Sequence, residues 1–141
     1  MDDQARLLVV EDHYETATFL ELTLSDTYDV TIASSADEAL QKADQHHYDL
    51  LLIDIALREE ATGVDLVGWL RERPDYADVP MIATTAQYVD EKRCDYLGQG
   101  FDEFLPKPYY PEDLMELIEE LLANYRARPH GNGSSQDRPG S

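Results

Sequence analysis

Residues 49–57 read Asp-Leu-Leu-Leu-Ile-Asp-Ile-Ala-Leu, an apolar run that a single acid, Asp54, interrupts. The polar stretch Arg-Glu-Glu-Ala-Thr-Gly follows at residues 58–63. A short apolar run that opens into a loop is typical of a buried strand in a parallel sheet. Ligands of such sheets bind beyond the carboxyl ends of the strands, so Asp54 is a candidate for chemistry. The stretch alone favours a simpler interpretation, in which Asp54 only caps the loop.

Strand and helix patterns alternate on both sides of this stretch. Apolar or alternating runs predict strands over residues 6–10, 28–33, 49–57, 80–85 and 101–106. Helical patterns cover residues 13–25, 35–46, the segment between Gly63 and Pro74, 89–99 and 111–125. Five strands that alternate with five helices predict the α/β class and a doubly wound five-stranded parallel sheet, (βα)5, with right-handed crossovers.

The helices differ in how clearly their apolar faces are marked. The first places Tyr14, Ala17, Leu20 and Leu24 near one face, and Trp69 in the third is expected to pack. The last has the clearest stripe, whereas the stripe over residues 89–99 is weak and indicates a loosely held helix.

The C-terminal composition divides the chain into a domain and a tail. From residue 127 the chain is rich in Arg, Pro, Gly, Asn and Ser and carries no apolar residue that could anchor it. We therefore expect one domain over residues 1–126 and a disordered tail over residues 127–141.

Composition excludes several classes of partner. The 141 residues contain 30 acids against 11 bases, a formal net charge of -19, which argues against direct binding of nucleic acid or of an anionic membrane. No apolar run approaches the ~20 residues that a membrane span needs. The single cysteine, Cys94, excludes an internal disulfide and fits a reducing compartment. The sequence therefore predicts a cytoplasmic protein.

Polar residues follow four of the five expected strands. They are Glu11-Asp12 after the first strand, Asp54 in the third, Thr85-Ala86 after the fourth and Lys107-Pro108 after the fifth. If these strands are neighbours, three carboxylates, one hydroxyl and one ammonium converge on one crevice. Crowded carboxylates repel one another unless a cation joins them, and all-oxygen ligands favour Mg2+. Such a crevice suits transfer of a phosphoryl group to Asp54.

This ordered set resembles the receiver domains of two-component response regulators. The four groups match, in order, the family's acid pair, phosphoacceptor aspartate, hydroxyl-small pair and lysine-proline pair. The run Gly-Phe-Asp-Glu-Phe-Leu-Pro-Lys-Pro at residues 100–108 is similar to the family's fifth strand. The resemblance spans residues 7–125 and implies the flavodoxin-like, CheY-like receiver fold.

The resemblance also implies roles for the individual residues. Asp12, Asp54 and the backbone carbonyl of Ala56 would bind Mg2+ directly, and Glu11 would act through a metal-bound water. Thr85 and Lys107 would contact phosphoryl oxygens, and Lys107 would pair with Asp54 before phosphorylation. In this family the peptide bond between Lys107 and Pro108 is typically cis.

A conformational switch follows from the same resemblance. On phosphorylation the Thr85 hydroxyl would move toward the phosphoryl group, and Phe104, at the family's aromatic switch position, could turn into the vacated space. The surface of the fourth helix, fifth strand and fifth helix would then change shape. Thr84 should point to the opposite face of its strand from Thr85, and its hydroxyl is expected to be structural.

The sequence departs from the family pattern beside the expected site. Many relatives have a proline four residues and a glycine eight residues after the phosphoacceptor. Here Arg58 stands four residues after Asp54, and Gly63 stands nine residues after it. Ala56 and Gln87 stand at positions that tune phosphoryl lifetime in the family. His13 follows the acid pair, but a hard-ion site has little use for imidazole, so we expect an exposed histidine in the first helical turn.

The leading interpretation is a response regulator that a histidine kinase or histidine phosphotransfer protein phosphorylates on Asp54. Its further partners would be a downstream protein target and a second copy, in a homodimer linked to phosphorylation. A docking module that never becomes phosphorylated is an alternative, which the intact set of Asp54, Thr85 and Lys107 disfavours. An aspartyl-nucleophile phosphatase of the haloacid dehalogenase type is another, but that family has a second acid where Ala56 stands.

So many acids exceed what one site could use, and adaptation to a salt-rich cytoplasm would explain them. On this hypothesis the midpoint of thermal unfolding rises strongly with molar KCl, because added ions screen repulsion between surface carboxylates. Circular dichroism melts across a KCl series measure the effect. A midpoint that does not respond to salt contradicts the hypothesis.

Overall fold

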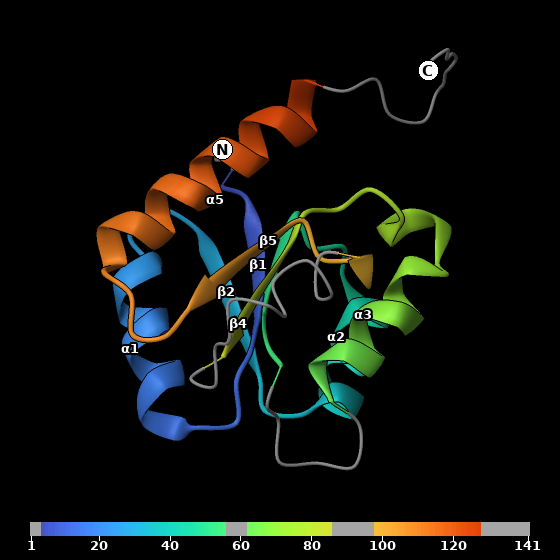
Figure 1. Cartoon of the computed structure of the whole chain (residues 1–141), viewed down its shortest axis with the longest axis horizontal. Coiled ribbons are helices and arrows are strands. Elements are labelled where there is room, and N and C mark those ends of the chain that lie inside the picture. The colour runs from blue at the N-terminus through green and yellow to red at the C-terminus, as the bar shows by residue number, and fades with distance from the viewer. Residues whose placement is uncertain (1–3, 56–61, 86–97, 128–141) are drawn as a thin grey trace.

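Strands and helices alternate along residues 4–55, 62–85 and 98–127, which the computed structural model describes (Figure 1). In chain order the elements are β1 (Arg6–Val10), α1 (Tyr14–Leu24), β2 (Asp29–Ala33), α2 (Ala36–Gln45), β3 (Leu50–Asp54), α3 (Gly63–Arg71), the 3-10 turn η1 (Pro74–Tyr76), β4 (Met81–Thr85), β5 (Glu103–Pro106) and α5 (Pro111–Ala127). Each strand and each α-helix lies on a segment predicted from the sequence, whereas the turn η1 was not predicted. The helix predicted over residues 89–99 falls mostly outside the described residues.

The five strands form one parallel sheet in the order β2-β1-β3-β4-β5. This order reverses direction between β1 and β3, so the carboxyl ends of those two strands flank a switch point of the topology, where open sheets bind ligands. The predicted doubly wound α/β sheet is confirmed. Among the described helices, α1 and α5 cover one face, and α2 and α3 cover the other (Figure 1).

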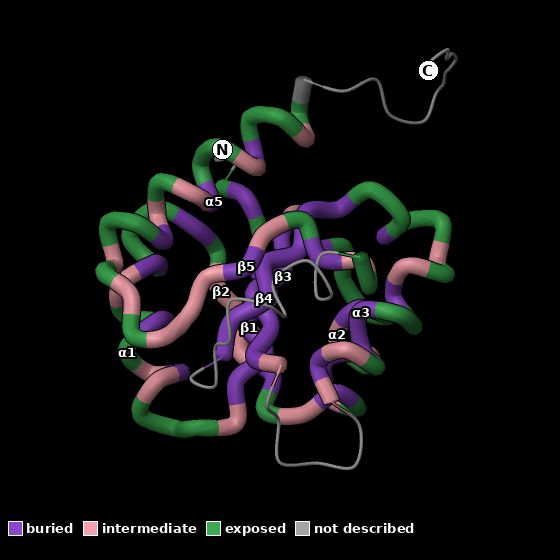
Figure 2. The backbone as a smooth tube through the Cα atoms, in the orientation of Figure 1, coloured by how far each residue is buried: buried purple, intermediate pink, exposed green. Residues whose placement is uncertain are grey.

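Side-chain alternation along the strands divides the core into two clusters. Leu8, Leu51 and Met81 pack toward α2 and α3. Their sequence neighbours Leu7, Leu50 and Ile82 pack toward α1 and α5. Because both faces are covered, all five residues of β3 and of β4 are buried, and the strands form the buried centre of the molecule (Figure 2).

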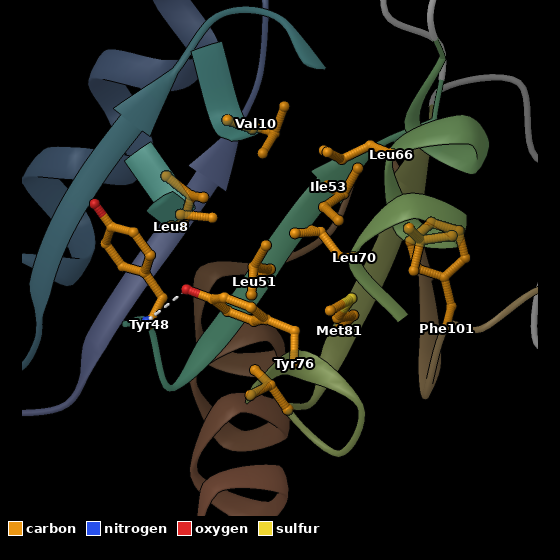
Figure 3. Close-up of a cluster of buried hydrophobic side chains, with 14 of the residues drawn as sticks. Leu8, Val10, Tyr48, Leu51, Ile53, Leu66, Leu70, Tyr76, Met81 and Phe101 are labelled. Carbon is orange, nitrogen blue, oxygen red and sulfur yellow. Dashed lines mark hydrogen bonds between the residues drawn. The ribbon is translucent and has the colours of Figure 1, made fainter. Parts of the chain in front are cut away.

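The α2/α3 side also contains a buried tyrosine that bonds to the turn before β3. The Tyr76 hydroxyl accepts a hydrogen bond from the Tyr48 amide at 3.0 Å (Figure 3). It also donates one to the His46 carbonyl at 3.1 Å. Burial raises the pKa of Tyr76, so the phenol keeps the proton that it donates. This pair of bonds fixes the start of the strand that ends in Asp54.

Arg71, at the end of α3, fixes the amino-terminal end of the sheet. Its guanidinium donates to the carbonyls of Tyr76 and Val79 and to the Gly100 carbonyl before β5, among other acceptors. It also pairs with Asp102 at 2.9 Å, and the same carboxylate oxygen accepts a bond from the Met81 amide. The fork of donors thus ties α3 to the starts of β4 and β5.

Two side chains expected to pack are largely exposed. Tyr14 is 82% exposed and Trp69 is 44% exposed. Tyr14 is the first residue of α1, so no earlier turn of the helix covers its side chain. Trp69 lies beside the stripe of Leu66, Val67 and Leu70 that α3 buries, not within it. The packing prediction is wrong for Tyr14, whereas Trp69 packs in part.

None of the described helices is both long and apolar enough to cross a membrane.

Gly63 allows the first turn of α3 to approach the end of β3. A Cβ at this position would lie 2.7 Å from the Asp54 carbonyl oxygen and 2.9 Å from the Ile55 Cα. Backbone cannot yield as a flexible side chain would, so we expect Gly63→Ala to lower the free energy of unfolding by about 1–3 kcal/mol in urea denaturation.

Gly68, in the same helix, is the matched control. A Cβ there meets nothing within 4 Å, so Gly68→Ala should raise the free energy of unfolding by about 0.5–1 kcal/mol. Equal effects of the two substitutions would contradict the close-approach argument.

Candidate functional site

The carboxyl ends of β1 and β3 bring two buried acids together. Glu11 directly follows β1, and its amide donates to the Ala33 carbonyl at 2.9 Å, which keeps it in line with the strand. Asp54 is the last residue of β3. Each is only 2% exposed, although both are charged residues that are rarely buried without a partner.

Lys107, which follows β5, is that partner. Its Nζ lies 2.9 Å from Glu11 Oε1 and 3.2 Å from Asp54 Oδ2. The Lys107 amide donates to the Thr85 carbonyl, and the bond between Lys107 and Pro108 is cis, as the resemblance implies. The expected pairing of Lys107 with Asp54 is therefore confirmed. It brings the ends of three strands to one point.

Burial by itself would lower the pKa of Lys107. The hydrogen bond to Glu11 and the charges of Asp54 and Glu11 outweigh burial, and the pKa of the ammonium is raised above its usual value. Lys107 is therefore a permanent cation at neutral pH. The site contains a fixed positive charge between two carboxylates.

Asp12 and His13 complete the acidic cluster. The His13 Nδ1 lies 3.0 Å from Glu11 Oε2 and 3.2 Å from Asp12 Oδ1. We expected His13 to be an exposed histidine in the first helical turn, and its side chain is 47% exposed. Its contacts with both acids were not predicted from the sequence. Adjacency to the acid pair was the available signal, but the direction of the ring depends on the entry into α1.

The cluster has a composition that could bind a metal ion. Ligand atoms of Glu11, Asp12, His13 and Asp54 all lie within 4.8 Å of one another. Carboxylate oxygens dominate the donor set, which fits a hard cation better than a soft one. The Ala56 carbonyl, the third expected ligand, lies outside the described residues, as do Arg58, Ala86 and Gln87.

Thr85 and Phe104 lie on the other side of the sheet from Lys107. Thr85 ends β4 and is 2% exposed. Alternation places its side chain on the α2/α3 side, where Phe104 is buried in the core cluster. Ala83 pairs with Phe104, so Thr85 is one step along this face from the aromatic ring. The arrangement brings together the two residues that the resemblance assigns to a switch.

A cleft of about 210 Å³ lies beside Lys107, lined by Thr16, Phe19, Lys107, Pro108 and Tyr109. Burial, together with the charges of Glu11 and Asp54, raises the pKa of Tyr109 to about 12. Its phenol is therefore neutral at physiological pH. Phe19 is 51% exposed, so the cleft presents an apolar ring to solvent.

Comparisons with known proteins agree with this geometry. The sequence profile of the response regulator receiver domain family matches residues 7–119. An uncharacterized 14.6 kDa protein in the sodA1 3' region of Leptolyngbya boryana is 36% identical over 83% of this chain and 89% of its own length. The response regulator ArlR of Staphylococcus saprophyticus is 31% identical over 90% of this chain, which spans only 55% of that protein.

Solved structures give the same answer. Chemotaxis protein CheY4 of Vibrio cholerae superposes with a TM-score of 0.79 at 28% identity, over 84% of this chain and 99% of that one. The receiver domain of Francisella response regulator 1452 has a TM-score of 0.79 at 25% identity, over 86% and 98% of the two chains. The strand order, the acid cluster paired with Lys107 and these similarities lead to one conclusion: the chain belongs to the response regulator receiver domain family of two-component signalling systems.

Proposed function

We propose that this receiver domain is a phosphorylation switch in the cytoplasm, with Asp54 as the phosphoryl acceptor. The observation that carries the proposal is the position of the Asp54 carboxylate. It is buried at the carboxyl edge of the sheet, 3.2 Å from the Lys107 ammonium and within the acidic cluster of Glu11 and Asp12. A nucleophilic carboxylate with a fixed cation beside it suits attack on an anionic phosphoryl group.

The reaction forms one bond and breaks one. A carboxylate oxygen of Asp54 attacks phosphorus, and the bond between phosphorus and the donor breaks, so that its electron pair leaves with the donor. The donor is the phosphorylated histidine of a histidine kinase or of a histidine phosphotransfer protein. Water later attacks the acyl phosphate, which restores Asp54 and releases inorganic phosphate. The domain thus catalyses its own modification and its reversal, and acts as a switch.

Glu11, Asp12 and Asp54 would hold Mg2+, with the Ala56 carbonyl as a further ligand. Glu11 would act through a bound water. When bound, Mg2+ offsets negative charge on the carboxylates and on the incoming phosphoryl group. The buried carboxylates support this assignment because the cluster carries three acids near one lysine. One ammonium leaves most of that charge uncompensated, and a divalent cation would complete the compensation.

Lys107 and Thr85 would act on the transferred group. In the resting state the Lys107 ammonium bonds to both Glu11 and Asp54. It would contact the phosphoryl oxygens as they arrive. Thr85 ends β4 with its side chain on the α2/α3 side, so its hydroxyl would have to reach over the end of the sheet to donate to one of those oxygens. Movement of Thr85 would free space on the α2/α3 side, where Phe104 is buried, and so change the surface around β5 and α5. A downstream protein, or a second copy of the domain, would bind the changed surface.

The apolar cleft beside Lys107 supports a protein donor. Phe19, which lines the cleft, exposes a large apolar surface, and Lys107, whose ammonium contacts Asp54, lines the same cleft. Exposed apolar side chains grouped beside a reactive group are typical of a docking surface. A partner bound there could bring its phosphohistidine to Asp54.

Acetyl phosphate tests the proposal without a protein donor. Incubated with acetyl phosphate and Mg2+, the domain should gain the mass of one phosphoryl group, and Asp54→Asn should not, because an amide is a poor nucleophile. Intact mass spectrometry measures the adduct. Without Mg2+ we expect little or none.

Asp26→Asn, an exposed carboxylate outside the site, is the matched control and should behave as wild type. Binding of beryllofluoride distinguishes rapid hydrolysis from lack of reaction. If the wild type neither gains mass nor binds beryllofluoride, Asp54 is not a phosphoryl acceptor and the domain acts as a docking module.

Lys107→Met tests whether the ammonium balances the buried acids. The substitution keeps the aliphatic stem and removes the charge, which leaves Glu11 and Asp54 uncompensated, so the free energy of unfolding should fall by about 3 kcal/mol without Mg2+. Saturating Mg2+ should restore more stability to the variant than it adds to wild type. Chemical denaturation with and without Mg2+ measures both effects.

Lys42→Met is the control, because the Lys42 pair with Glu38 is at the surface and should change stability by less than about 1 kcal/mol. If Lys42→Met and Lys107→Met lower the free energy of unfolding equally, the buried ion pairs of Lys107 stabilise the fold no more than a surface pair does.

A further inference from the structure

Thr84 is a buried threonine beside the site to which neither the sequence nor the family resemblance gives a role in the chemistry. It is 1% exposed. Within the described part of the chain, its Oγ1 has no hydrogen-bond partner. A buried hydroxyl without a partner costs stability, and valine would fill the same space without that cost. The hydroxyl therefore does not stabilise the resting fold, contrary to the structural role expected from the sequence.

The sheet register gives the position of this hydroxyl. Thr84 pairs with Asp54 of β3 on one side and with Leu105 of β5 on the other. Leu105 packs toward α1 and α5, as do Leu52 and Ile82, two residues before Asp54 and Thr84 on their strands. Alternation therefore places the side chains of Asp54 and Thr84 on this same face.

Lys107 must cross β4 to reach its partners. Its backbone continues β5, since its amide donates to the Thr85 carbonyl, whereas its ammonium contacts Asp54 on β3 and Glu11 beyond β1. In the order β1-β3-β4-β5 the side chain thus extends across the end of β4. The last β4 side chain on that face is Thr84, because Thr85 faces the opposite side.

An ammonium has three donors, and the hydrogen bonds to Glu11 and Asp54 use two of them. A phosphoryl group attached to Asp54 would come between that carboxylate and the ammonium. The ammonium would then have to withdraw along its own side chain, toward β4. The hydroxyl on β4 that faces this path is that of Thr84.

We propose that Thr84 is a positioning residue for Lys107: the Thr84 hydroxyl accepts a hydrogen bond from the ammonium as the phosphoryl group is transferred to Asp54, and keeps that bond afterwards. This inference rests on the proposed function of Asp54. It explains why a residue that weakens the resting core is present: the partner that the hydroxyl lacks in the resting state becomes available in the phosphorylated state. Thr84 itself touches neither phosphorus nor the attacking oxygen.

The test compares Thr84→Val, which keeps the shape and removes the hydroxyl, with Thr84→Ser, which keeps the hydroxyl. The rate of phosphorylation by acetyl phosphate with Mg2+ is followed by intact mass over a range of donor concentrations. We expect the maximal rate to fall about tenfold in Thr84→Val, as for loss of one hydrogen bond to a charged group, with the half-saturating donor concentration unchanged. Thr84→Ser should retain most of the wild-type rate.

Urea denaturation of the unphosphorylated proteins separates positioning from packing. Thr84→Val should unfold at a higher urea concentration than wild type, so a slower reaction cannot be due to a damaged fold. Thr31→Val, a change of the same kind on β2 away from the acids, should leave the rate unchanged.

Two results would overturn the inference while leaving the function of Asp54 intact. One is a Thr84→Val protein that reacts at the wild-type rate, and the other is an equal loss of rate in the valine and serine variants, which would indicate packing alone. A wild type that gains no phosphoryl group overturns the proposed function and this inference together, so the two failures are distinguishable.

Discussion

The contact of the Lys107 ammonium with Glu11 and Asp54 is the interaction on which the site depends. Two carboxylates that are each 2% exposed cannot remain charged and adjacent without a cation between them. The three residues come from the ends of β1, β3 and β5, so the pairing requires these strands to end at the same edge of the sheet. The charge balance that holds the site together is also the one that phosphorylation would change.

Because side chains alternate along the strands, the contact between Lys107 and the two acids lies on one face of the sheet and Phe104 lies on the other. Glu11, Asp54 and Lys107 meet on the side of the sheet that α1 and α5 cover, whereas Phe104 is buried on the α2/α3 side. The neighbours Thr84 and Thr85 therefore face opposite sides of one strand. If Asp54 is phosphorylated as proposed, a change there would reach both threonines through the same short segment of backbone, from one face of the sheet to the other.

Contacts elsewhere in the fold position the carboxyl ends of the strands, where the acids lie. Gly63 lets α3 begin against the backbone of Asp54, and no larger residue would fit there without movement. At the other end of the sheet, Arg71 binds backbone carbonyls and Asp102, and Tyr76 bonds to the start of β3. Strands fixed at both ends present their carboxylates in a constant arrangement, as preorganised electrostatics requires.

The sequence by itself determined the elements and the candidate residues. Apolar runs of strand length and one well-marked amphipathic helix are local signals, and Asp54 and Lys107 follow strands whatever the strand order is. Only the tertiary structure decided that β4 lies between β3 and β5, so that the Lys107 side chain extends past the end of β4 to reach Asp54, and that His13 contacts both acids. It also decided that Tyr14 is exposed. Strand order, ring direction and burial depend on contacts between residues far apart in the chain, which no local pattern contains.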